Sequence, residues 1–134
     1  MFEVLDHTAD VGILVRADTL DEFFAEAARG MFSILHERTA EGEAVVHEIR
    51  LDAQDMETLL VNWLSELLFL FESRNFVPRE FRFSALEPEL LEATCVGTAV
   101  ELPAPGTEIK AVTHHMLRVE YTSDGWEARI YFDL

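Results

Sequence analysis

Residues 55–74, DMETLLVNWLSELLFLFESR, decide the fold because they predict a helix that is apolar on nearly every side. We expect Asp55 to cap this helix and the helix to run to about Arg74. Its apolar side chains are Leu59, Leu60, Val61, Trp63, Leu64, Leu67, Leu68, Phe69, Leu70 and Phe71. A helix without a polar face must lie centrally, with a sheet on one face and other protein around the rest. We also expect part of this surface to serve a subunit or partner interface.

A second helix is predicted upstream, where Thr19 is followed three residues later by Glu22 in a capping-box pattern. Helical spacing then gives a single buried stripe: Leu20, Phe23, Phe24, Ala27, Met31, Ile34 and Leu35. A polar link at residues 37–43 should end this element.

The remaining sequence predicts β-strands at residues 2–5, 11–17, 45–51, 79–86, 90–102, 109–113, 116–122 and 126–134. Ser123-Asp124-Gly125 predicts a hairpin turn. Small residues along 90–102 (Ala93, Cys95, Gly97 and Ala99) would let a helix lie close to that strand. Hairpins predominate, so the predicted class is α+β: two helices packed on a mostly antiparallel sheet, as one two-layer domain over residues 1–134.

Composition narrows the function classes. The 134 residues carry a net charge of −16, which repels nucleic-acid backbones and favours cations and basic protein surfaces as counterparts. Cys95 is the sole cysteine, and its small neighbours predict a packed thiol in a reducing compartment. The sequence predicts no signal peptide, and its longest apolar stretch falls short of the about 20 residues that span a bilayer. We therefore expect a soluble cytoplasmic protein without a membrane partner.

A polar cluster, His7-Thr8-Ala9-Asp10, lies between two apolar runs near the start of the sequence. Polar groups in such surroundings must be hydrogen-bonded or must coordinate something, because burying them unpaired costs several kcal/mol. One interpretation is that Thr8 and Asp10 fix a bend between two strands. The other is that the cluster forms part of a cation site.

Asp133 ends an otherwise apolar last strand, and a terminal strand often pairs beside the first. Asp133 and Asp10 could then share a site with the imidazole of His7 or His115. Carboxylate-rich sets favour Ca²⁺, Mg²⁺ or Mn²⁺, whereas zinc is disfavoured because there is no Cys pair and no His-x-x-x-His. The sequence contains no Gly-rich phosphate loop, Gly-x-Ser-x-Gly or Cys–His nucleophile pattern. Paired acids acting as general acid and base remain the enzymatic alternative.

The octapeptide Asp6-His7-Thr8-Ala9-Asp10-Val11-Gly12-Ile13, followed by a Phe/Ala-rich helix, resembles the opening of an archease. The resemblance continues in family order through residues 59–68 (LLVNWLSELL), 76–80 (FVPRE) and 106–113 (GTEIKAVT) to Phe132-Asp133. It covers essentially the whole chain. The sequence departs at His114, where the family usually has an aromatic residue, so His115 is the better family-equivalent histidine.

This resemblance implies a non-enzymatic accessory protein. Archeases assist RtcB-type RNA ligases in tRNA splicing and RNA repair, where they speed formation of the ligase–guanylate and keep the ligase turning over. They are also chaperone-like modulators of tRNA-modifying enzymes, here a tRNA methyltransferase. The implied metal residues are Asp10, Asp133 and Leu134 with His7 in support, and the implied partner-contact or supporting residues are Lys110, Thr113 and His115.

Ca²⁺ is the expected cofactor, with Mg²⁺ and Mn²⁺ as alternatives. The expected partner is the RNA ligase or a tRNA methyltransferase, without strong direct binding of nucleic acid, and self-association stays open. Two competing classes remain: a small stand-alone metal-dependent hydrolase, and a general holdase that uses the apolar helix.

Overall fold

The computed structural model describes residues 1–6, 10–36, 42–101 and 106–134, and within these ranges it contains two helices and eight strands. The helices are α1 (Leu20–Leu35) and α2 (Met56–Arg74). The strands are β1 (Phe2–Asp6), β2 (Asp10–Ala17), β3 (Gly42–Asp52), β4 (Phe76–Glu87), β5 (Leu90–Val100), β6 (Ala111–Val112), β7 (Glu120–Thr122) and β8 (Gly125–Asp133).

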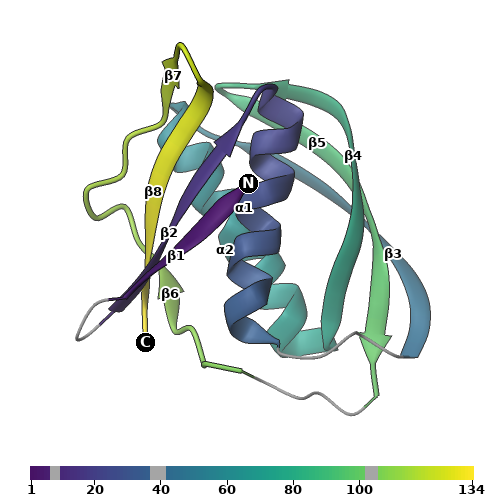
Figure 1. Cartoon of the computed structure of the whole chain (residues 1–134). Helices are drawn as coiled ribbons and strands as arrows, with labels where there is room; N and C mark the ends of the chain where they lie inside the picture. The colour runs from purple at the N-terminus through teal and green to yellow at the C-terminus, as the bar shows by residue number, and fades with distance from the viewer. Residues whose placement is uncertain (7–9, 37–41, 102–105) are drawn as a thin grey trace.

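The strands form two antiparallel sheets. One sheet has the order β1-β2-β8-β6 with β7 also paired to β8, and the other has the order β3-β5-β4. The predicted α+β class is confirmed, but the strands are divided between two sheets where a single sheet was expected. Figure 1 shows the helices between the five-stranded sheet and the three-stranded sheet.

The apolar helix α2 explains why two sheets are needed. It contacts β3, β4 and β5 of one sheet, β6 of the other, and α1. Its buried residues are Leu59, Leu60, Val61, Trp63, Leu64, Leu67, Leu68 and Leu70. The predicted central position is therefore confirmed, because a helix that is apolar all round must be covered on opposite sides. Of its large apolar side chains, Phe69 is the one described as exposed, at 59%. Neither described helix is long and apolar enough to cross a membrane.

Trp63 joins the two helices to the three-stranded sheet. Its side chain is fully buried, and its indole N–H donates to the main-chain oxygen of Phe24 at 3.0 Å. The rings of Phe81 and Phe83 lie 5.7 and 5.4 Å from the Trp63 ring, measured between centroids. This hydrogen bond satisfies the one polar atom of the side chain at the centre of the core.

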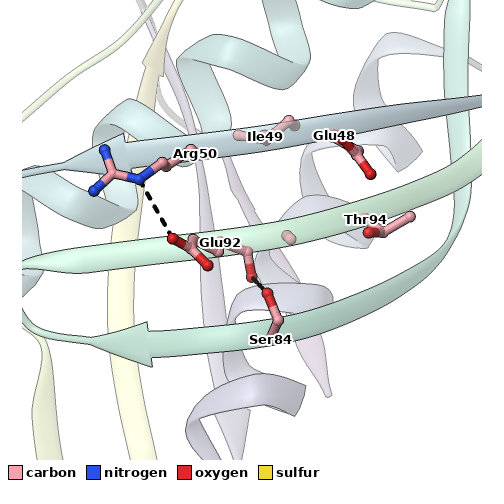
Figure 2. A pocket seen from close by; sticks show the side chains of 7 residues that line it. Glu48, Ile49, Arg50, Ser84, Glu92 and Thr94 are labelled. Atoms are coloured by element: carbon pink, nitrogen blue, oxygen red, sulfur yellow. Dashed lines mark hydrogen bonds and ion pairs between the residues drawn. The ribbon is translucent and has the colours of Figure 1, made fainter.

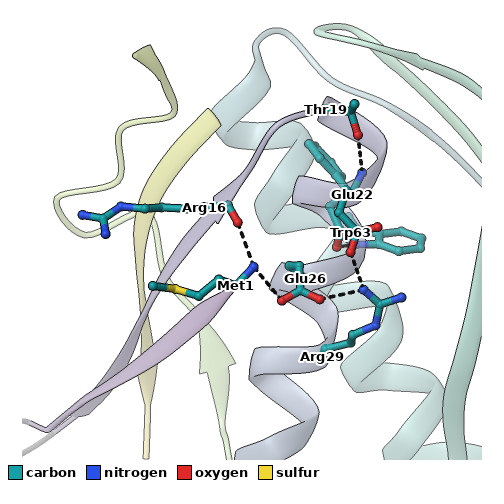
Figure 3. Close-up of polar contacts among 8 residues, drawn as sticks. Met1, Arg16, Thr19, Glu22, Glu26, Arg29 and Trp63 are labelled. Atoms are coloured by element: carbon teal, nitrogen blue, oxygen red, sulfur yellow. Dashed lines mark hydrogen bonds and ion pairs between the residues drawn. The ribbon is translucent and has the colours of Figure 1, made fainter. Parts of the chain in front are cut away.

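The predicted helix starts are confirmed by their caps. Thr19 Oγ1 accepts from the main-chain N–H of Glu22 at 3.2 Å, and Asp55 Oδ1 accepts from that of Thr58 at 2.7 Å. Figure 3 shows the first cap beside a second contact of α1, in which the Met1 amino group lies 2.9 Å from Glu26 Oε2. The same amino group donates to the main-chain oxygen of Arg16, so β1 and β2 are tied to α1.

Some strand boundaries differ from the prediction. β4 begins at Phe76 and includes Pro78. An edge strand tolerates proline, because the missing N–H lies on the side that pairs with no other strand. β6 and β7 are shorter than predicted, because residues 113–119 form a loop that contains a turn, in which Leu117 N–H donates to His114 O. Gly42 and Glu43, expected in the polar link, begin β3, and the rest of that link lies outside the described residues, as does Leu102.

The small-residue row on β5 has two different neighbours. Ala93 and Cys95 belong to the buried core under the helices, as predicted. At Gly97, however, an added Cβ would lie 2.2 Å from the main-chain oxygen of Val77. Gly97 therefore makes room for the backbone of β4, where the register shifts at Pro78.

Candidate functional site

The ladder between β2 and β8 brings Asp10 and Asp133 together. The two residues are direct register partners in this antiparallel pair. Directly opposed residues share one face of a sheet, with Cβ atoms about 4.5–5.5 Å apart. The last strand therefore pairs beside an early strand as predicted, although that strand is β2, and β1 lies on its other side.

Lys110 is held beside Asp133 by the main chain. Its N–H donates to the main-chain oxygen of Asp133 at 2.8 Å, and the next residue, Ala111, is the register partner of Asp133. The side chain of Lys110 is exposed. Asp133 is thus flanked by Asp10 on one neighbouring strand and by the Lys110 segment on the other.

Thr113 and His115 both contact Tyr131, which lies on β8 two residues before Asp133. Both the N–H and the Oγ1 of Thr113 donate to the main-chain oxygen of Tyr131 at 3.0 Å. Thr113 Oγ1 in turn accepts from the N–H of His115 at 3.3 Å. The His115 and Tyr131 rings meet edge-to-face, 6.0 Å apart between centroids. Thr113 therefore holds the turn in place, and His115 lies against Tyr131.

Tyr131 is a site neighbour that the sequence did not reveal. Alternation along β8 puts Tyr131 on the same face as Arg129 and Asp133, yet it is buried, with 7% of its surface exposed. Its register partner is Gly12, and a Cβ on Gly12 would lie 2.9 Å from two carbons of the Tyr131 ring. Glycine inside a strand often marks such a close approach, so Gly12 was the available indication.

Of the remaining predicted metal residues, Leu134 lies within the described ranges and His7 does not. Leu134 follows Asp133 and is 39% exposed. His7 and Thr8 lie outside the described residues, so both predictions for them, ligation and a hydrogen-bonded bend, stay predictions. His114 is exposed at the turn, next to His115.

The two carboxylates where β2 begins and β8 ends have the chemistry that suits a hard cation. Two carboxylates directly opposite each other repel. A divalent cation between them would remove that repulsion, and hard cations are bound by carboxylate oxygens. No cluster of three or more His, Cys, Asp or Glu suited to a metal occurs in the described part of the chain. The described residues therefore offer a two-carboxylate site, which a main-chain oxygen or a residue outside the described ranges would have to complete.

Comparisons of the sequence and of the fold with known proteins point to one family. The model of the Archease protein family matches residues 2–134. A protein archease of Methanosarcina barkeri is 39% identical over 139 residues, which cover 99% of this chain and 95% of that protein. Protein 1598 of Methanobacterium thermoautotrophicum, solved in solution, has a TM-score of 0.75 and 29% identity over 99% of this chain and 98% of its own.

A crystal structure from Thermotoga maritima, described as an archease and possible chaperone, shares the fold. Its TM-score is 0.73 at 20% identity, over 97% of this chain and 94% of that chain. The family match spans nearly the whole sequence, and the fold agrees with it. This chain therefore belongs to the archease family.

Proposed function

We propose that this protein is a non-enzymatic accessory factor of an RtcB-type RNA ligase, which promotes guanylylation and turnover of the ligase in tRNA splicing and RNA repair. The observation that carries the proposal is the direct opposition of Asp10 and Asp133 on β2 and β8. This arrangement suits a divalent cation at the end of the sheet where β2 begins and β8 ends, where a second protein can reach it. Family membership supports the assignment, since the chain matches archeases from end to end.

Asp10 and Asp133 would hold the cation, with an oxygen of Leu134 and the imidazole of His7 completing the set. Ca²⁺ suits such oxygen-rich ligands best, and Mg²⁺ or Mn²⁺ are the alternatives. A bound cation supplies a local positive charge for oxygen ligands of the partner. The chain itself contributes a fixed frame: Thr113 holds the adjacent turn on β8, and His115 packs on Tyr131.

The charge of the chain supports docking on a protein surface over direct binding of RNA. A net charge of −16 is repelled by phosphate backbones and attracted to the basic surface of an RNA-handling enzyme. A cytoplasmic location, where such a ligase acts, fits the free buried thiol of Cys95.

A chaperone-like role toward a tRNA methyltransferase is the second candidate, favoured by the description of the Thermotoga maritima protein as a possible chaperone. A general holdase that uses the apolar face of α2 has less support. The large apolar residues of that helix are buried in the fold, and Phe69 is the exposed exception among those described.

The proposal is tested by guanylylation of the host's own ligase with GTP, with and without this protein, across Mg²⁺, Mn²⁺ and Ca²⁺. We expect the wild type to speed ligase–guanylate formation, and Asp10→Ala and Asp133→Ala to remove the stimulation while the circular dichroism spectrum is preserved. Glu3→Ala, which removes an exposed carboxylate from β1 of the same sheet, is the matched control and should stimulate fully. Full stimulation by either aspartate variant would overturn the proposal, as would substrate turnover by the protein alone.

A further inference from the structure

The three-stranded sheet leaves one long strand edge open. β3 pairs with β5 and with no other described strand, and it lies at the outer edge of the order β3-β5-β4 (Figure 1). Its eleven residues pair with β5 without a register break. The opposite edge, β4, is interrupted by Pro78 and by two register shifts, devices that discourage pairing with another strand. β3 has neither device, so its edge is the better template for an added strand.

The register identifies the main-chain groups that face the open edge. Ala53 N–H donates to Glu89 O at 3.1 Å, which continues the ladder beyond the Asp52–Leu90 pair. In an antiparallel pair, hydrogen-bonded and non-hydrogen-bonded residues alternate. The odd-numbered residues of β3 therefore bond to β5, and the N–H and C=O groups of Val46, Glu48 and Arg50 point away from it.

The side chains of these three residues lie on the outer face of the sheet. Val46 is 59% exposed, and Glu48 and Arg50 are exposed beside it. A hollow of about 270 Å³ crosses the three strands on this face, lined by Glu48, Ile49, Arg50, Ser84, Glu92, Ala93 and Thr94 (Figure 2).

Three charged side chains line this hollow, Glu48, Arg50 and Glu92, and they differ in their pairing. Arg50 is already neutralised, with Nε 3.3 Å from Glu92 Oε1 and one terminal nitrogen 3.0 Å from Asp52 Oδ2. Glu48 makes no ion pair with a described residue. The unmatched charge beside the hollow is therefore a carboxylate, which a cation from outside would complement.

We propose that β3 binds an extended, basic segment of a partner protein by strand addition, with a Lys or Arg of that segment opposite Glu48. The main-chain groups of Val46, Glu48 and Arg50 would bond to the added strand, and Val46 would supply the apolar contact. A second copy of this chain is a poorer occupant, because it would bring another net charge of −16 to the same edge. Repulsion thus selects against self-pairing and favours a basic strand.

This surface is separate from the aspartate pair, which lies on the other sheet. Its test needs no ligase, so failure here and failure of the proposed function are distinguishable. Two blocked peptides, TKVKVKT and TEVEVET, are titrated into the whole protein, and amide hydrogen exchange is followed by NMR.

We expect the lysine peptide to slow exchange at Val46, Glu48 and Arg50 and to leave the amides of His47 and Ile49, already bonded to β5, unchanged. The glutamate peptide should have no effect. Glu48→Lys replaces a favourable cross-strand pair by a repulsive one and should weaken binding of the lysine peptide about fivefold or more. Glu3→Lys, the same charge change on the other sheet, should change the affinity less than about twofold by the same reasoning.

Three results would overturn the proposal. The first is equal binding of the two peptides. The second is an absence of slowing at the alternate β3 amides with the lysine peptide. The third is slowing of those amides without peptide as protein concentration rises, which would assign the edge to a second copy of the chain.

Discussion

Asp10 of β2 and Asp133 of β8 face each other across one antiparallel ladder, and the hydrophobic core fixes that register. The neighbouring pairs Val11–Phe132, Ile13–Ile130 and Val15–Ala128 place their side chains in the core. A slip by one residue would turn every one of these apolar side chains to the outer face. The packing that stabilises the sheet therefore also holds two repelling carboxylates together, and this is the physical basis for a cation site.

Gly12→Ala tests the contact that frames this site. The added Cβ would lie 2.9 Å from the Tyr131 ring, so the ring must move and the edge-to-face contact with His115 must change. We expect a loss of about 1–3 kcal/mol in the free energy of unfolding, as for other overpacked positions. Urea denaturation measures the loss, and the ring resonances of His115 report the movement. A variant with wild-type stability and unshifted His115 resonances would contradict the described packing.

Trp63→Phe should destabilise the fold by about 2–3 kcal/mol, because it removes buried volume and leaves Phe24 O without the indole donor. Trp126→Phe is the matched control, since Trp126 is only partly buried. We expect it to cost less than about 1 kcal/mol. Equal losses for the two variants in chemical denaturation would show that Trp63 is not the central core residue.

The lowered pKa of Glu26 makes the free energy of unfolding depend on pH in the acid range. Burial by itself would raise this pKa, but hydrogen bonds and charge from the Met1 amino group and Arg29 outweigh it and lower the pKa below 4.5. A depressed carboxyl pKa stabilises the fold above the unfolded value near 4.5, and the stabilisation is lost as pH falls through the folded pKa. Glu26→Gln should cost about 1 kcal/mol at pH 7 and flatten the dependence of stability on pH below 4.5.

Glu22→Gln is the control for this effect. Glu22 binds the same Arg29 at 2.8 Å, but its side chain is 55% exposed, and solvent screens the pair. Its stability should match that of the wild type from pH 3 to 7. An unaltered pH profile for Glu26→Gln would refute the role of the Met1–Glu26–Arg29 contacts.

Burial raises the pKa of the Cys95 thiol to about 12, so almost no thiolate forms at pH 8. We expect the native protein to resist a disulfide reagent at pH 8 and to react fully in concentrated urea. The time course of absorbance with and without urea checks this. Rapid stoichiometric labelling of the native protein would mean that Cys95 is accessible.

The sequence predicts local features of this fold well and distant ones only in part. Thr19 and Asp55 mark the helix starts because capping involves residues three positions apart. The division into two sheets was not predicted, because alternation along β3, β4 and β5 shows which residues face inward and not which strands pair. The Asp10–Asp133 pair was predicted because a terminal strand often pairs beside the first, whereas the burial of Tyr131 depends on Gly12 across the ladder.

The central claim, that Asp10 and Asp133 share one divalent cation, is tested most directly by paramagnetic broadening with substoichiometric Mn²⁺. At a charge of −16 the whole surface attracts cations, so the location of the broadening is what matters. We expect the amides of Asp10, Val11, Phe132 and Asp133 to broaden first, excess Ca²⁺ to reverse the effect, and Asp133→Asn to abolish it. Broadening that starts at other carboxylates, or that persists unchanged in Asp133→Asn, would contradict the account.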